Sequence, residues 1–140
     1  MAAVGILALA FTFLDDSASA QAQANLPTIT HVYKTVANPP PYEGTTEIRA
    51  NVQAPHDGKR HPVVISFHGG ALINGNRGDV KMGLPEFCAK EGFILVSPDY
   101  RLGPEIKVPQ IIEDVRDLLA WVREKGPDLF GADPDRIAVT

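Results

Sequence analysis

Cysteine is nearly absent from this sequence, and no cluster of one charge sign is present. Cys88 is the only cysteine, so no disulfide can form within the chain. Its neighbours Phe87 and Ala89 predict a buried helix position and an inert thiol rather than a nucleophile. Lysine and arginine number 13 against 17 acidic residues, for a net charge of −4. Because no basic patch exists, nucleic acid is not expected as a partner.

Long hydrophobic runs are also missing. The apolar segment from Met1 to Leu14 is too short to cross a bilayer, so no stable membrane span is expected. Ala18-Ser19-Ala20 has the small-x-small pattern of a signal-peptidase site, and Ala22-Gln23-Ala24 is a second option. We therefore expect residues 1–20 to be a signal peptide and residues 21–27 a leader, with a secreted or periplasmic destination. The segment lacks a basic start, and the alternative is an apolar terminus that is retained.

Recognisable nucleophile and cofactor motifs are absent as well. The serines are Ser17, Ser19, Ser66 and Ser97. None of them lies in Gly-x-Ser-x-Gly, the pattern of a serine held on a sharp strand-to-helix turn. Gly69, Gly70 and Gly75 do not have the Gly-x-Gly-x-x-Gly spacing of a dinucleotide site. The histidines are not spaced as convergent metal ligands. We therefore expect no cofactor and no metal.

A buried-strand pattern that ends in glycine is the most informative stretch that is present. Residues 62–67 form an apolar, β-branched run, and His68, Gly69, Gly70 and Ala71 follow it directly. Such a run is typical of a buried strand. Glycine lets the chain turn sharply, adopt φ values that other residues resist, and bring N–H groups close to a ligand. The alternative is a tight strand exit without a catalytic role.

Strand and helix patterns alternate along the chain and predict an α/β fold. Strands are expected at residues 28–36, 45–53, 62–67, 93–97 and 136–140, and helices at residues 85–91 and 109–125. The longer helix carries an apolar stripe made of Ile111, Ile112, Val115, Leu118, Leu119 and Val122. Gly126-Pro127 should end it. Unalternated apolar strands separated by helices indicate a mostly parallel sheet with helices on both faces, and the first two strands are expected to pair antiparallel at one edge of it.

Three blocks of this sequence resemble the α/β-hydrolase fold, specifically esterases and lipases of the hormone-sensitive-lipase-like, fold-3 type. The blocks are His68–Ala71, Ser97–Glu105 and Asp133–Thr140, in the family's order. The resemblance implies that residues 28–140 are the N-terminal half of such a domain, truncated before the nucleophile elbow. It also implies the strand order first, second, fourth, third, fifth, which leaves the last strand as an exposed edge.

The resemblance also assigns roles to the glycine stretch. The backbone N–H groups of Gly70 and Ala71 would be oxyanion-hole donors. Ala71 replaces the family's commoner third glycine, but its N–H is retained. His68 and Gly69 would be structural, with His68 holding the loop by hydrogen bonds rather than acting as the catalytic histidine.

A second group of motif residues follows the strand expected at residues 93–97. Asp99, Tyr100 and Arg101 lie there, with Glu105 close behind. Charged groups near a strand end usually need partners. We favour an ion-pair clamp on the loop, and the alternative is a pocket-lining role.

The resemblance implies a serine hydrolase that cleaves small-molecule carboxylic esters through an acyl-enzyme. The given chain lacks the triad and is expected to be inactive alone. A fragment of a prolyl-peptidase-like serine peptidase and a non-catalytic α/β-hydrolase-like binding protein are the alternatives.

Overall fold

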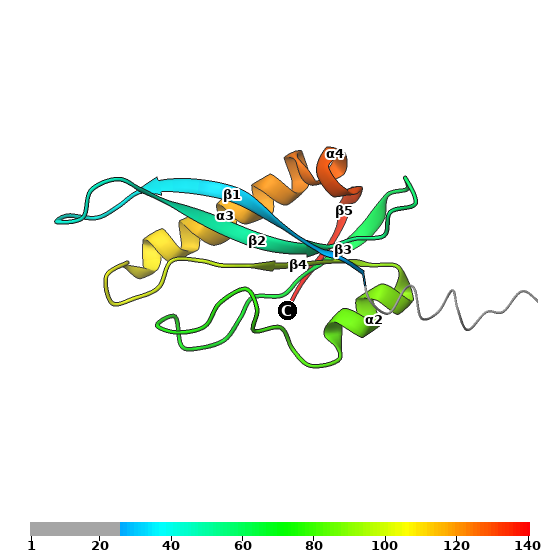
Figure 1. Ribbon diagram of the computed structural model, residues 1–140, viewed down its shortest axis with the longest axis horizontal. Helices are drawn as coiled ribbons and strands as arrows, with labels where there is room; N and C mark the ends of the chain where they lie inside the picture. The colour runs from blue at the N-terminus through cyan, green and yellow to red at the C-terminus, as the bar shows by residue number, and fades with distance from the viewer. Residues whose placement is uncertain (1–25) are drawn as a thin grey trace, which may run out of the picture.

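A computed structural model describes residues 26–140, and the expected signal peptide and most of the expected leader lie outside these residues. Figure 1 shows one sheet with helices packed against it. The strands are β1 (Thr28–Ala37), β2 (Thr45–Gln53), β3 (His61–Ile65), β4 (Ile94–Pro98) and β5 (Ala132–Val139). The helices are α2 (Leu84–Glu91), α3 (Val108–Glu124) and α4 (Gly126–Phe130).

The sheet has the strand order β1-β2-β4-β3-β5, which confirms the predicted order. β3 pairs in parallel with both β4 and β5, whereas β1–β2 and β2–β4 are antiparallel. The sheet is therefore mixed, with the antiparallel pairings at the edge that β1 and β2 form. The short connection between β1 and β2 permits only antiparallel pairing of these two strands, while helices lie in the connections between the parallel strands.

Helices cover both faces of the sheet, as predicted. Figure 1 shows α2 on one side of the sheet and α3 with α4 on the other. Right-handed crossovers explain this, because the chain steps from β3 to β4 in one direction and from β4 past β3 to β5 in the other. The core between the sheet and α3 includes Val63, Ile65, Ile94, Val96, Leu118 and Val122. Cys88 is buried on α2, as predicted, and burial raises the pKa of its thiol.

Three details of the helices and strands differ from the predictions. Ile112 is 45% exposed, because the buried face of α3 is centred on Ile111, Leu118 and Val122. α3 ends at Glu124, just before Gly126-Pro127, as predicted, but Gly126-Pro127 also starts the unpredicted helix α4, since proline lacks the N–H that a first helical turn leaves free anyway. β5 begins at Ala132, four residues earlier than expected, and remains at the edge of the sheet.

No helix among residues 26–140 is both long and apolar enough to cross a membrane.

Candidate active site

The predicted site residues meet at the carboxyl ends of two neighbouring parallel strands. His68 to Ala71 follow β3, and Asp99 to Arg101 follow β4. Ligands in open sheets of this kind bind beyond the carboxyl ends of the strands. The hydroxyl of Tyr100 donates to the backbone oxygen of His68 at 2.9 Å. Their rings stack with centroids 4.3 Å apart and planes inclined by 6°.

Burial strengthens the contact between these two residues. His68 and Tyr100 are 5% and 7% exposed, respectively. Burial raises the pKa of the Tyr100 hydroxyl, so this hydroxyl remains protonated and can donate. The strand exit after β3 is therefore fixed by residues that leave β4.

The side chain of His68 orients the first candidate donor, the N–H of Gly70. Its Nδ1 lies 2.8 Å from the carbonyl oxygen of Gly69, and since a carbonyl only accepts, Nδ1 carries the proton. The Gly69 carbonyl and the Gly70 N–H belong to one planar trans peptide, in which they point in opposite directions. By holding this carbonyl, His68 sets the direction of the Gly70 N–H.

The second candidate donor, the N–H of Ala71, is also oriented by a hydrogen bond to the carbonyl of its own peptide unit. The N–H of Ile73 donates to the Gly70 carbonyl at 3.1 Å, and that carbonyl shares a peptide with the Ala71 N–H. Within residues 26–140, neither the Gly70 N–H nor the Ala71 N–H donates to a protein group. Gly70 and Ala71 are both exposed. The loop therefore presents two oriented backbone donors with no internal partner.

The backbone of this turn adopts unusual conformations. The φ angles of Gly70, Ala71 and Leu72 are 109°, 54° and 65°. Left-handed φ in a non-glycine residue costs about 1–2 kcal/mol, so two in succession are a local strain of the kind found at functional sites. Residue 70 must be glycine, because its φ is positive and a Cβ there would overlap the backbone oxygen of Asn74. Gly69 needs no such φ and has open space at its Cβ position, contrary to the expectation for this residue.

Asp99 and Arg101 each have a charged partner. Asp99 forms an ion pair with Arg77 of the loop that follows β3. Arg101 pairs with Asp114 of α3 at 2.8 Å. Glu105 is exposed, and no ion pair involves it within the described part of the chain. Arg101 and Glu105 both border a cavity of about 470 Å³ beside the β1–β2 hairpin, so Arg101 both forms an ion pair and lines a pocket.

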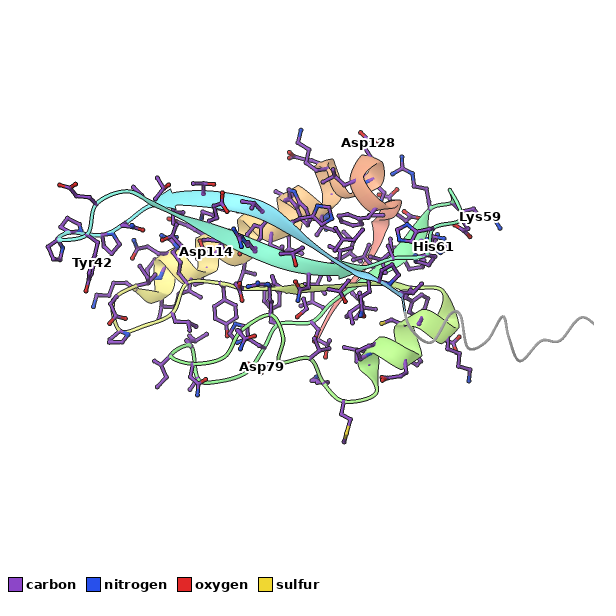
Figure 2. The ribbon with its side chains drawn as sticks, viewed as in Figure 1. Tyr42, Lys59, His61, Asp79, Asp114 and Asp128 are labelled. Carbon is purple, nitrogen blue, oxygen red and sulfur yellow. The ribbon has the colours of Figure 1, made fainter. Side chains whose placement is uncertain are left out.

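Asp114 is the centre of a buried charge network. Figure 2 shows it on α3 beneath the strands, and it is 0% exposed. Arg101 donates to it from Nε and Nη2, each at 2.8 Å, and from its backbone N–H at 3.0 Å. Lys34 of β1 donates at 2.8 Å and also pairs with Asp117.

Burial alone would raise the pKa of the Asp114 carboxyl. The hydrogen bonds from Arg101 and Lys34 outweigh burial and hold this pKa below its ordinary value. Asp114 is therefore a carboxylate that anchors the segment after β4 to both α3 and β1.

Sequence reasoning missed Arg77, Lys34 and Asp114. It also missed Gly75, where a Cβ would overlap Nδ1 of His68. Asp114 could have been found from the sequence, because it interrupts the apolar stripe of α3 at a core-facing position, where a charge needs a partner. For Arg77 the sequence offered no such signal, since its partner Asp99 is 22 residues away. Within residues 26–140, no group of His, Cys, Asp and Glu is arranged to hold a metal ion.

Comparisons with known proteins find similar sequences and structures. A family model described as alpha/beta hydrolase fold matches residues 64–140. The carboxylic ester hydrolase LipN of Mycobacterium tuberculosis is 36% identical over 94 residues, which cover 66% of this chain and 25% of LipN. The non-reducing polyketide synthase adrD of Penicillium rubens is 36% identical over 97 residues, which cover 66% of this chain and 4% of that protein.

Solved structures of an esterase also resemble this chain. Esterase 2 of Thermogutta terrifontis, phosphonylated by cyclosarin, matches with a TM-score of 0.68 and 26% identity. The match covers 82% of this chain and 42% of the esterase. The chain thus spans between a twenty-fifth and about two fifths of the length of these relatives. Because the family model matches more than half of the chain, the protein belongs to the alpha/beta hydrolase fold family.

Proposed function

We propose that this chain supplies the oxyanion hole of a serine hydrolase that cleaves small-molecule carboxylic esters through an acyl-enzyme. The observation that carries the proposal is the pair of oriented, unpartnered N–H groups of Gly70 and Ala71 at the carboxyl end of β3. Relatives that are named as a carboxylic ester hydrolase and as esterases support the choice of substrate class.

The two donors would act on the carbonyl oxygen of the ester. When a nucleophile adds to the carbonyl carbon, this oxygen becomes an oxyanion that fixed N–H groups stabilise more strongly than the ground state. Each such donor is worth about 3–4 kcal/mol by comparison with single-donor deletions in other hydrolases. The Gly69 and Gly70 carbonyls, which share peptide units with these donors, already accept hydrogen bonds. Little reorganisation of the donors is therefore needed during the reaction.

We further propose that the nucleophile reaches this loop from the end of β5. Thr140 lies beside the exit of β3: its N–H donates to the Ile65 carbonyl at 2.9 Å, and the Phe67 N–H donates to its carbonyl at 3.1 Å. Lys81 also donates to the Thr140 hydroxyl at 2.6 Å. A residue joined to Thr140 would therefore emerge at the edge that carries Gly70 and Ala71.

The 140-residue chain alone is expected to hydrolyse no p-nitrophenyl ester above a heat-inactivated control, because none of its serines lies in Gly-x-Ser-x-Gly. A form extended beyond Thr140 that supplies a Gly-x-Ser-x-Gly serine together with a triad acid and histidine is expected to gain activity. Turnover by the 140-residue chain that Ser66→Ala or Ser97→Ala abolishes would contradict the proposed source of the nucleophile. An extended form with the complete triad but no esterase activity would instead favour a peptidase or a binding protein, which a prolyl-peptide substrate distinguishes.

Export of the protein is proposed from the sequence pattern of residues 1–20 alone. Cleavage after Ala20 would make Gln21 the first residue of the mature protein. Amino-terminal sequencing of the protein recovered outside the cytoplasm is expected to begin at Gln21. Recovery of the exported protein with Met1 in place would show that the segment is retained.

A further inference from the structure

Arg77 joins the irregular loop after β3 to two neighbouring strands. Its guanidinium forms the ion pair with Asp99 and also donates from Nε to the side chain of Asn51 at 3.2 Å. Its backbone N–H donates to the Asp99 carboxylate at 2.8 Å. Its carbonyl accepts from the Ser97 hydroxyl at 2.6 Å. One loop residue is thereby tied to both β2 and the end of β4.

The partners of the two loop ends are adjacent in the sequence. Asp99 holds Arg77 at the far end of the loop, and Tyr100 holds His68 at the near end. A third tie lies between them, because the Gly103 N–H donates to the Leu72 carbonyl at 2.8 Å. The stretch between the two ends, residues 69–76, contains both candidate donors. The short segment that follows β4 therefore holds both ends of this stretch.

Asp99 is itself held from two directions. Its backbone N–H donates to the Arg49 carbonyl of β2 at 2.8 Å, and its carbonyl accepts from the Tyr33 hydroxyl of β1 at 2.7 Å. Burial raises the pKa of Tyr33, so this hydroxyl remains a donor. A partner fixed in this way can position a loop, whereas two mobile surface side chains cannot.

From these contacts we infer that Arg77 is a positioning residue for the oxyanion hole. The guanidinium of Arg77 forks between Asp99 and Asn51 and keeps the far end of the loop, at residue 77, closed against β2 and β4. This closure maintains the hydrogen bond from the Ile73 N–H to the Gly70 carbonyl, which orients the Ala71 N–H. The inference rests on the proposed function for its catalytic meaning. The closure itself is a property of the substrate-free chain and is measured without any reaction.

Hydrogen exchange of the dilute 140-residue chain tests this inference, with the Ile73 amide as the reporter. Arg77→Gln is expected to speed exchange at Ile73 about five- to tenfold, because loss of a half-buried ion pair makes local opening easier. Amides of the α3 core, such as that of Leu118, should keep their rates. Arg77→Lys, which retains the charge but not the fork, is expected to restore the Ile73 rate only in part.

The matched control is Arg136→Gln, which removes an ion pair with Asp133 of the same chemistry, outside the 69–76 loop. It is expected to leave Ile73 unchanged. Unchanged Ile73 exchange in Arg77→Gln, or equal acceleration in the control, would overturn the inference. If Arg77→Gln does not fold, Arg77→Lys decides, since wild-type exchange at Ile73 would show that the fork is not needed. Failure of ester hydrolysis would count against the proposed function without altering this result.

Discussion

Replacing Asp114 by alanine is expected to lower the free energy of unfolding by about 3–5 kcal/mol, the usual cost of removing one partner from a buried ion pair. Arg101 and Lys34 would lose the carboxylate that accepts from both of them, and their side chains are each only 15% exposed. The cost comes mainly from the Arg101 charge, which is left without its partner in a poorly solvated site, whereas Lys34 keeps its ion pair with Asp117. Urea unfolding monitored by circular dichroism measures it.

Asp117→Ala is the matched control on the same helix. Asp117 also pairs with Lys34, but its side chain is 51% exposed. Exposed ion pairs contribute about 0–1 kcal/mol, so this variant should unfold almost like the wild type. Equal losses in the two variants would show that burial does not set the cost. If Asp114→Ala fails to fold while Asp117→Ala folds normally, the ranking still holds.

The same network gives stability a defined dependence on acid. The folded pKa of Asp114 lies below its ordinary value, so the unfolded state binds the proton more readily. The stability that Asp114 contributes is therefore fully present above the unfolded pKa and is lost as pH falls through the folded pKa. Wild-type stability should decline steeply below about pH 4, and Asp114→Ala should show a smaller decline over that range.

The fold was largely predictable because its signals are local. Apolar runs without alternation marked β3 and β4, and proline and glycine bounded α2. The mixed character of the sheet could be foreseen only at β1 and β2, since the antiparallel pairing of β2 with β4 joins residues about 45 positions apart. α4 was missed because Gly126-Pro127 fits a helix end and a helix start equally well.

The candidate site was predictable only in part. The sequence singled out Gly70 and Ala71 as candidate donors, but it could not show how their N–H groups are oriented, because the contacts that close the loop come from other segments. Lys34 and Asp114 are 80 residues apart. No local pattern pairs a lysine in an edge strand with an aspartate in a helix, so such partners become evident only when the chain is folded. Gly75 has the same difficulty, since its importance depends on what lies across the loop.

Replacing Gly75 by alanine is the second change with a large expected effect. Gly75 has a φ of 104°, a conformation that residues with a Cβ rarely adopt. A methyl group there would overlap Nδ1 of His68 and lie 2.6 Å from the Gly69 oxygen, so it would meet both atoms of the hydrogen bond that orients the Gly70 N–H. Strain and overpacking together should cost about 2–4 kcal/mol of unfolding free energy, measured by urea unfolding.

Gly69→Ala separates this effect from a general intolerance of side chains in the loop. Motif reasoning ranks Gly69 above Gly75, because Gly69 belongs to the His-Gly-Gly stretch, but the geometry reverses the order. No atom lies within 4 Å of a Cβ at Gly69, and its φ is not left-handed, so alanine there should leave stability unchanged or raise it by up to about 1 kcal/mol. If both variants lost stability equally, or if only Gly69→Ala did, the close approach of Gly75 to His68 would not be what fixes the candidate oxyanion donors.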